Sequence, residues 1–425
     1  MTKNAFILNF LKLYNILWRG ALPFLKKSKR LAQGFKQRVS CSHLSSADLW
    51  IQAASAGEAL LAVKIIQSLD PPHPIRVLIT TTTRQGYDLL TQELGDVPPL
   101  AHIHFQLSWF PFDQPDIIDA YIKKVSPRVV VLLETEIWPA FLYYLKKNGI
   151  KTLIVNARLT RKSFKGYYRT RWIWHALTCD TILATSELDA ARYRKLFPNA
   201  RVDVMPNIKF DTLSTNTTNS KQYHGRDLDM FIDTKAPLTI FASIRKEEEP
   251  QVLWMLEHLL KEFPTQTVAL FPRHMHRLAA WQEHLSGTSL PWQLKSEIKT
   301  HQVSFKIILW DTFGELNRAY EMADCAFVGG SLSPLGGQNF IEPIIKGVPT
   351  VTGPFLEDFK WVKPDIFQLG TVHKAENKEQ AVDRMLDILQ ERSPRSRIRE
   401  RAVAYIEKNR GGTRYACTKI IDALY

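Results

Sequence analysis

The stretch WIQAASAGEALLAVKII, residues 50–66, decides the fold prediction. It opens with an apolar run typical of a buried strand, turns through the small residues Ser55, Ala56 and Gly57, and continues with helical spacing. Glu58 follows the turn directly, where a carboxylate is either a favourable first-turn charge for the helix dipole or a catalytic base aimed into a cleft. The stretch therefore predicts a strand–turn–helix unit with a candidate functional residue at its turn.

The same pattern of a short apolar run followed by a helical segment repeats along the chain. A polar stretch without period, residues 211–227, divides the repeats into two groups. Continuous apolar strands separated by helices predict parallel sheets covered on both faces, so the fold class is α/β with two consecutive Rossmann-like halves. The expected strands lie in 49–55, 75–82, 128–134, 151–157, 181–186 and 201–206 before the divide, and in 237–244, 265–273, 305–311, 324–331, 347–353 and 369–374 after it.

Length and composition agree with a globular protein of two domains. With 425 residues, 45% of them hydrophobic and 23% charged, the chain exceeds one ordinary core and is neither disordered nor polytopic in a membrane. Its four cysteines are far apart and form no CxxC pair, so neither a zinc cage nor a disulfide framework is expected. The expected division is a leader (1–40), an N-terminal Rossmann-like domain (41–211), a linker (212–235) and a C-terminal Rossmann-like domain (236–425), whose final helix is a candidate to pack on the N-terminal domain.

The leader combines basic and apolar residues. The formal charge of the chain is +14, and no acidic residue precedes Asp48, whereas the apolar side chains of residues 6–18 have the spacing of a broad amphipathic helix. Its apolar runs are too short and interrupted for a spanning helix of ~20 residues. We expect the leader to lie on an anionic membrane surface; the alternative is a helix that docks on the protein's own core. The pattern does not indicate nucleic-acid binding, because no reading motif accompanies the basic residues.

Charged residues follow several of the expected strands, where open α/β sheets bind their ligands. Glu134 and Glu136 stand at the end of the run 128–134, and strand geometry would let only one of them face a cleft. Lys209 precedes the polar divide and so lies near the domain junction. Arg273 ends a strand of the second half and is suited to gripping phosphate.

A glycine-rich loop in residues 328–343 follows one strand and precedes an expected helix. Backbone amides in such a loop favour phosphate, and Glu342 would be a ribose ligand or a helix cap. The turn Phe313-Gly314-Glu315 offers further amides to the same nucleotide. The loop matches neither GxGxxG nor a Walker loop, which disfavours dehydrogenase and kinase functions. His274 and His276 lack a third ligand, so no metal site is expected.

The order of these segments resembles one family, the 3-deoxy-D-manno-octulosonic acid (Kdo) transferases of Gram-negative lipopolysaccharide synthesis. The resemblance runs from the leader to the C-terminus. It rests on SAGE (55–58), TTTRQG (81–86), FPFDQP (110–115), ETEIWP (134–139), NARL (156–159), NIKFD (207–211), FPRH (271–274), DTFGEL (311–316), AFVGGSL (326–332) and GGQNFIEP (336–343).

The resemblance implies a GT-B glycosyltransferase whose two Rossmann-like domains face an interdomain cleft, with the acceptor bound by the N-terminal domain and the CMP-sugar by the C-terminal one. Such an enzyme inverts configuration, uses no metal or other cofactor, and transfers Kdo from CMP-Kdo to a lipid A precursor, lipid IVA, at the cytoplasmic side of the inner membrane. The resemblance assigns Glu58 as the proton acceptor, and Glu134 and Lys209 as transition-state stabilisers. It assigns CMP contacts to Pro272, Arg273, Phe313, Gly314, Glu315, Asn339, Phe340, Ile341 and Glu342.

This chain departs from the family pattern in the expected donor site. Gln338 stands where the family has histidine, and Ser243-Ile244-Arg245 replaces a Ser-Thr-His stretch. Glutamine cannot carry a proton, and Arg245 adds a fixed charge. Two alternatives are therefore a GT-B enzyme for a different nucleotide sugar and a catalytically silent membrane-bound nucleotide-binding protein. Retention of the candidate catalytic residues favours an enzyme.

Overall fold

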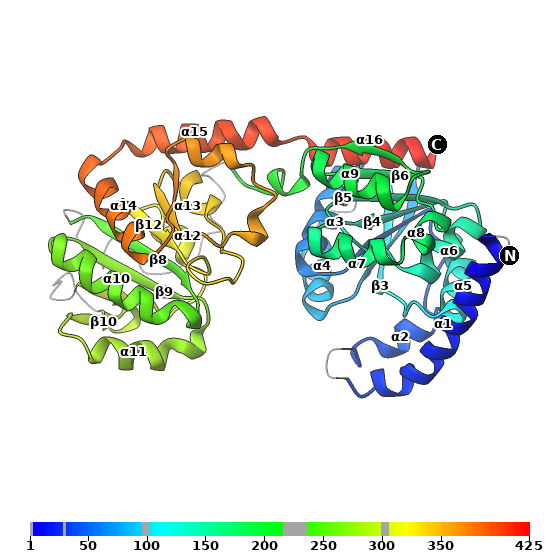
Figure 1. The fold of residues 1–425 in the computed structure, drawn as a ribbon, viewed down its shortest axis with the longest axis horizontal. Helices are drawn as coiled ribbons and strands as arrows, with labels where there is room; N and C mark the ends of the chain where they lie inside the picture. The colour runs from blue at the N-terminus through cyan, green and yellow to red at the C-terminus, as the bar shows by residue number, and fades with distance from the viewer. Residues whose placement is uncertain (1–2, 29–30, 96–101, 216–235, 299–305) are drawn as a thin grey trace. The chain divides into compact units, whose positions relative to one another are not determined.

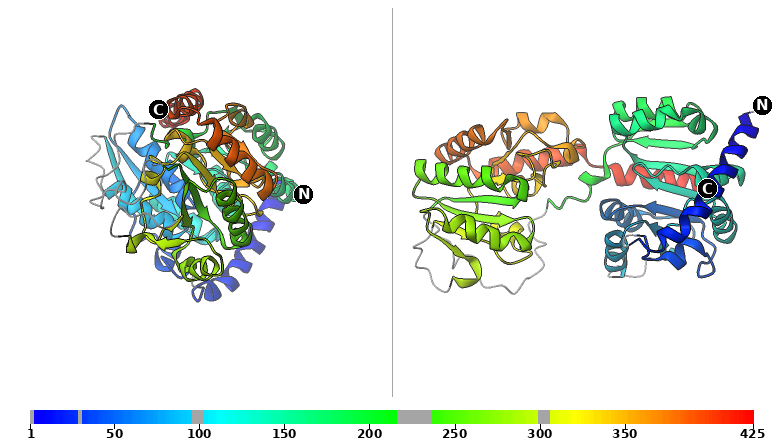
Figure 2. Two further views of the ribbon diagram at one scale, coloured as in Figure 1. Left: turned by 90° about the vertical axis from the view of Figure 1, so that its left-hand side faces the viewer. Right: turned by 60° about the horizontal axis from the view of Figure 1, so that its bottom comes forward.

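The computed structural model describes residues 3–28, 31–95, 102–215, 236–298 and 306–425. The chain forms two compact units: unit 1 comprises Met1–Leu213 and Asn409–Tyr425, and unit 2 comprises Ser214–Lys408 (Figure 1). Most of the predicted linker, residues 216–235, lies outside the described residues. Each unit is a parallel seven-stranded sheet with helices on both faces (Figure 2), which confirms the predicted α/β fold.

The sheet of unit 1 has the strand order β3-β2-β1-β4-β5-β6-β7. The order reverses between β1 and β4, which pair in parallel with Gln52 opposite Leu132. Parallel sheets place ligand sites at the carboxyl ends of strands beside such a switch point. The strands are β1 (Leu49–Ala53), β2 (Ile75–Thr81), β3 (Ile103–Trp109), β4 (Val129–Leu133), β5 (Lys151–Ala157), β6 (Thr181–Ala184) and β7 (Arg201–Val204).

Two apolar cores cover the faces of this sheet. Side chains alternate along a strand, so Trp50 belongs to one core and Ile51 to the other. Each fully buried Val, Leu or Ile contributes about 1.5–3 kcal/mol to folding. The helices of unit 1 are α1 (Lys3–Leu25), α2 (Phe35–Val39), α3 (Ala56–Ser68), α4 (Arg84–Gly95), α5 (Pro115–Val125), α6 (Pro139–Lys147), α7 (Arg161–Arg169), α8 (Arg171–Ala176), α9 (Glu187–Leu196), the 3-10 turn η1 (Ile208–Phe210) and α16 (Gly412–Leu424). The helix α16 packs against α3, β4 and β5.

Helix α1 docks on unit 1 through one face. Ile7 and Leu11 are buried in the core that contains Trp50, and Tyr14 donates a 3.0 Å hydrogen bond to Asp113. Burial raises the pKa of Asp113 to about 7, although this carboxylate also accepts the first amides of α6. This face of α1 therefore packs on the protein's own core, which was the alternative considered for the leader.

A second face of α1 is apolar and exposed. Its large side chains leave more than half of their surface accessible: Leu13 58%, Ile16 64%, Leu17 63% and Phe24 75%. None of the described helices is long and apolar enough to cross a membrane.

Unit 2 repeats the architecture with the order β10-β11-β9-β8-β12-β13-β14, which reverses between β8 and β12. Its strands are β8 (Leu238–Ile244), β9 (Thr267–Pro272), β10 (Trp292–Leu294), β11 (Ile307–Leu309), β12 (Cys325–Val328), β13 (Thr350–Thr352) and β14 (Val372–Lys374). Its helices are η3 (Lys246–Glu248), α10 (Glu249–Glu262), η4 (Met275–Arg277), α11 (Leu278–Ser286), η5 (Lys295–Glu297), α12 (Leu316–Ala319), α13 (Ile341–Ile345), η6 (Glu357–Phe359), η7 (Pro364–Gln368), α14 (Lys378–Glu391) and α15 (Arg395–Asn409).

Candidate active site

Glu58 lies at the start of α3, beside the switch point of the unit 1 sheet. The Ala54 amide donates a 2.6 Å hydrogen bond to its Oε2, and the Ser55 hydroxyl donates a 3.0 Å bond to its Oε1. Ser55 also caps the helix by accepting from the Glu58 amide. Burial, followed by the negative charge of Glu136, raises the pKa of Glu58 to about 7. Glu58 is thus both a helix-start residue and a carboxylate able to take a proton near neutral pH.

Glu134 begins directly after β4 and forms an ion pair with Lys209. The backbone of Glu134 is left-handed, with φ 55°, and its amide donates to Val155 at 3.0 Å. Its Oε1 lies 2.8 Å from the Lys209 Nζ and 3.9 Å from the Arg158 Nη1. The expected strand 128–134 therefore ends at Leu133. The expectation that strand geometry lets only one of Glu134 and Glu136 face a cleft was also wrong, because residues two apart on a strand share one face. Both carboxylates act on Glu58, since each raises its pKa.

The turn that carries Lys209 is fixed by two asparagines. The Asn207 Oδ1 accepts from the Lys209 amide at 2.9 Å. The Oδ1 of Asn156, a buried residue with φ 55°, accepts from the Ile208 amide at 3.0 Å. Two of the sequence motifs, NARL and NIKFD, therefore meet at this turn.

Asp211 joins the same turn to the C-terminal helix. Its carboxylate accepts from the amide of Gly411 at 2.8 Å and from that of Thr413 at 2.5 Å, at the start of α16. Arg410 donates to the carbonyl of Leu213. The position of Lys209 thus depends on residues about 200 positions later in the chain.

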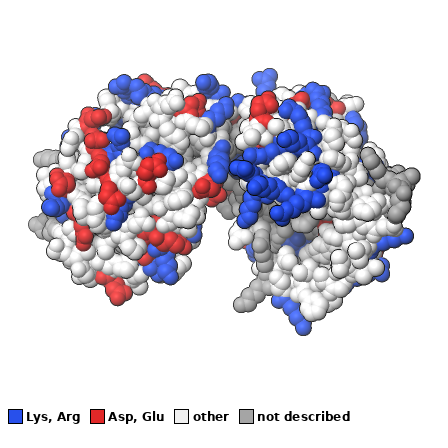
Figure 3. Space-filling view, viewed as in Figure 1, with Lys and Arg blue, Asp and Glu red and all other residues white. Residues whose placement is uncertain are grey.

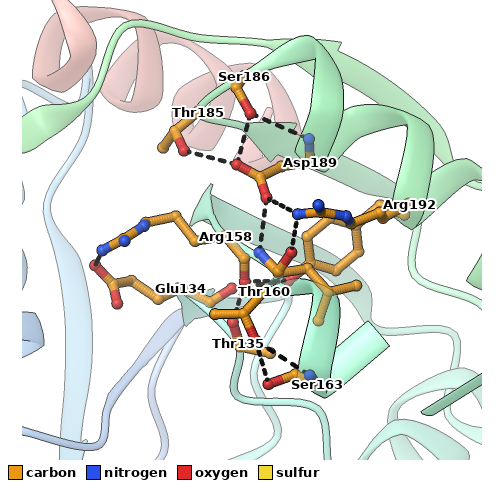
Figure 4. A network of polar contacts seen from close by, with 11 residues as sticks. Glu134, Thr135, Arg158, Thr160, Ser163, Thr185, Ser186, Asp189 and Arg192 are labelled. Atoms are coloured by element: carbon orange, nitrogen blue, oxygen red, sulfur yellow. Dashed lines mark hydrogen bonds and ion pairs between the residues drawn. The ribbon is translucent and has the colours of Figure 1, made fainter. Parts of the chain in front are cut away.

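A network of hydrogen bonds next to Glu134 connects the loops that follow β4, β5 and β6 (Figure 4). Thr135 donates to the carbonyl of Arg158. Asp189, at the start of α9, accepts from the Leu159 amide at 3.0 Å, and Arg192 donates to the Leu159 carbonyl at 2.5 Å. The sequence pattern gave Arg158 no role, although this residue lies within NARL. The available signal was the position of an arginine directly after an expected strand.

In unit 2, Pro272 ends β9 and Arg273 follows it. The Arg273 amide donates to the Ile244 carbonyl at 2.8 Å, and its side chain is exposed. Burial raises the pKa of Glu342, whereas Asn339 and Arg273 lower it. The Asn339 Nδ2 donates to the Glu342 Oε1 at 2.8 Å. The structure therefore brings Arg273, Asn339 and Glu342 together.

The other expected donor contacts differ in exposure. Phe340 and Ile341 are fully buried. Phe313 is 77% exposed, and Gly314 has φ 84°. Burial alone would raise the pKa of Glu315, but hydrogen bonds from Thr312, Lys295 and Trp310 lower the pKa below its ordinary value.

The glycine-rich loop already holds an anion of the protein itself. Glu248 is completely buried, and its carboxylate accepts from the amides of Gly330, Ser331 and Leu332 at 2.5, 2.8 and 2.7 Å. The amides that the sequence offered to an external phosphate are thus bound by an internal carboxylate. Sequence reasoning missed Glu248, because a carboxylate 82 residues before the loop gives no local signal.

Basic side chains gather on the surface of unit 1 where α7 and α8 lie (Figure 3). Helix α7 has no acidic residue in its first turn and no buried residue. Its exposed cations are Arg161, Lys162, Lys165 and Arg169. In the described parts of the chain, no three His, Cys, Asp or Glu side chains are grouped as metal ligands would be.

The sequence of this chain is similar to those of known transferases. Residues 28–212 match the family model of the 3-deoxy-D-manno-octulosonic-acid transferases (kdotransferases). The 3-deoxy-D-manno-octulosonic acid transferase of Haemophilus influenzae is 28% identical over 407 residues, which cover 93% of this chain and 91% of that protein. The C-terminal CMP-Kdo binding domain of WaaA from Acinetobacter baumannii is 29% identical, covers 40% of this chain and 89% of that domain, and has a TM-score of 0.37.

The fold is shared more widely. A glycosyltransferase from Rickettsia africae is 13% identical, with a TM-score of 0.55 over 90% of this chain and 99% of that one. Its likeness concerns the fold alone, and it extends over both units. The chain carries the kdotransferase family domain in residues 28–212 and is a homologue of Kdo transferases over most of its length.

Proposed function

We propose that the chain is a glycosyltransferase of lipopolysaccharide biosynthesis that transfers Kdo from CMP-Kdo to the lipid A precursor lipid IVA. The observation that carries the proposal is Glu58, a carboxylate with a pKa of about 7 at the switch point of the unit 1 sheet, near the ion pair of Lys209 and Glu134. The match of residues 28–212 to the kdotransferase family model and the similarity to Kdo transferases support the reaction class.

The proposed transfer is a direct displacement with inversion. A sugar hydroxyl of the acceptor attacks the anomeric carbon of Kdo, and Glu58 takes the hydroxyl proton as the new carbon–oxygen bond forms. The bond between the anomeric carbon and the CMP phosphate oxygen breaks, and its electron pair leaves with CMP. A base with a pKa near 7 suits this step, because a substantial fraction of it is unprotonated at neutral pH and it is more basic than an ordinary carboxylate.

Positive charge for the reaction comes from the protein in this proposal. Lys209 is held by Glu134 at 2.8 Å, so its ammonium is oriented before the substrate arrives. Arg273 is exposed at the end of β9, where its guanidinium can bind a phosphate oxygen pair. These cations support a reaction without a metal or another cofactor, and activity that survives EDTA is the expected result.

The proposed acceptor and location follow from unit 1. Helix α7 presents four exposed cations, which suit a phosphorylated lipid. The exposed apolar face of α1 suits the interface of an anionic membrane. We propose attachment at the cytoplasmic side of the inner membrane through this helix.

The test is mass spectrometry of lipid IVA incubated with CMP-Kdo and the purified protein. Wild type should give a product heavier by one or more Kdo units, and Glu58→Gln should give almost none. Glu93→Gln is the matched control, since Glu93 is an exposed glutamate of α4 in the same unit. If the folded wild type gives no product with CMP-Kdo but does with another nucleotide sugar, the donor is wrong. If no donor is consumed, the chain is not this enzyme.

A further inference from the structure

We propose that Glu136 is a positioning residue of the proposed transfer: its carboxylate, fixed by two neutral hydrogen-bond donors, sets the pH at which Glu58 begins to act as a base. The inference rests on the proposed function and deepens the description of the same site. Glu136 follows β4 and is mostly buried.

Glu136 is held by two neutral side chains. The Gln52 Nε2 and the Trp138 Nε1 each donate to its Oε2 at 3.1 Å. Burial raises the pKa of Glu136 above its ordinary value, and the two hydrogen bonds oppose that rise. Two donors aimed at one carboxylate oxygen favour the charged form.

Gln52 is itself fixed within the sheet. Its Oε1 accepts from the Thr80 hydroxyl at 2.6 Å, and the Thr80 oxygen accepts from the Trp50 Nε1 at 2.8 Å. Because Thr80 donates to Oε1, the amide of Gln52 is oriented with its Nε2 toward Glu136. A buried polar chain thus runs from Trp50 through Thr80 and Gln52 to Glu136.

Glu136 differs from Glu134 in its electrostatic balance. Glu134 faces the cations Lys209 and Arg158, which offset its charge. Among the residues that the structure describes, no cation is paired with Glu136. The charge of Glu136 therefore acts on Glu58 without local compensation, and it is the second cause, after burial, of the raised pKa of Glu58.

The groups that act on this pair come from several elements. Glu134, which follows β4, also raises the pKa of Glu58, and it is itself paired with Arg158 after β5 and with Lys209 on η1. Tyr167 of α7 is a further titratable group here, and burial and the charge of Glu136 raise its pKa. Gln52 occupies β1, two residues before Ala54, whose amide binds Glu58. Glu136 and Glu58 are thus connected through the ends of the adjacent strands β1 and β4.

The experiment compares the pH dependence of kcat/KM for wild type, Glu136→Gln and Glu136→Asp. The glutamine variant keeps the shape and removes the charge, so the acidic limb of the profile should move to lower pH by roughly one unit. The aspartate variant keeps the charge and should return the limb toward its wild-type position. A purely structural role would lower kcat/KM at every pH and leave the limb in place, which would overturn the proposal.

A second measurement needs no substrate. Carboxyl 13C NMR of the full chain, with the Glu58 signal assigned from Glu58→Gln, should show Glu58 titrating at lower pH in Glu136→Gln than in wild type. Unchanged titration overturns the inference whatever the substrate is. A shifted titration in a protein that transfers no Kdo would support the inference and contradict the proposed function.

Trp138→Phe covers the case in which Glu136→Gln does not fold. It removes the indole N–H and so raises the pKa of Glu136, because that hydrogen bond lowers it. A smaller fraction of Glu136 is then charged near neutral pH. The acidic limb of the kcat/KM profile should therefore move to lower pH, by less than in Glu136→Gln. A limb that moves to higher pH in this variant contradicts the proposal.

Discussion

Replacing Glu58 with glutamine should stabilise unit 1 at pH 8 while it removes the proposed base. The folded protein raises the pKa of this carboxyl from 4.5 to about 7, through burial first and the charge of Glu136 second. The native state therefore favours the protonated form, and this favourable contribution is complete below pH 4.5 and lost as the pH rises through 7. At about 1.4 kcal/mol per pH unit, the native state loses ~3 kcal/mol across this window.

Glutamine has no such window, because it stays neutral at every pH. The free energy of unfolding of Glu58→Gln should exceed that of wild type by ~2–3 kcal/mol at pH 8 and match it near pH 4.5. The glutamine oxygen can still accept from the Ala54 amide, which bonds the carboxylate at 2.6 Å. Hydrogen exchange of amides in β1 and β4 reports the stability of unit 1 specifically.

Glu93→Gln serves as the control, since an exposed glutamate on the same unit should change stability little at either pH. Two results would refute the reasoning. One is a Glu58→Gln protein that is no more stable than wild type at pH 8. The other is a stabilisation of equal size at pH 4.5 and pH 8, which would show that the effect does not come from ionisation.

Three further predictions concern other parts of the molecule. Glu248→Gln should cost ~2–4 kcal/mol of unfolding free energy, because its NH2 would face two backbone amide donors whichever carboxylate oxygen it replaced; the exposed Glu247→Gln is its matched control in thermal melts, and equal melting temperatures would contradict the expectation. Lys209→Met should lower kcat by ~10²–10³ with little change in melting temperature, and an unchanged kcat would remove Lys209 from the mechanism. Ile16→Asn with Leu17→Asn should weaken binding to anionic lipid vesicles in flotation assays without loss of folding, since both side chains are more than 60% exposed; unchanged flotation would argue against α1 as the membrane contact.

Much of the fold was predictable because buried parallel strands are continuously apolar. The run around residues 49–55 corresponds to β1, and the turn before Glu58 was visible in its small residues. The strand ends were less predictable, and Glu134 is the informative case. Its φ of 55° ends β4 before the two glutamates, and no local sequence pattern signals that a glutamate will adopt a left-handed backbone.

The candidate site residues that directly follow a strand were predictable from the sequence. Residues that support the site from a distant part of the chain were less predictable. Glu58 follows β1 and Arg273 follows β9, so strand ends pointed to both. Glu248 serves the glycine-rich loop from 82 residues away. Such contacts depend on which strands become neighbours in the sheet, and a single sequence does not state this.

The hydrogen bonds of Asp211 to the start of α16 also bear on the order of events during synthesis. Helix α16 is translated after all of unit 2, yet it places Ala416 and Ile420 in a core of unit 1. Domains usually fold as the ribosome delivers them, from the N-terminus onward. Unit 1 departs from this order, because the turn that carries Lys209 gains its anchor only when α16 emerges. A nascent chain can thus complete unit 2 while the turn of Lys209 still lacks its support, which delays the assembled site until translation is nearly finished.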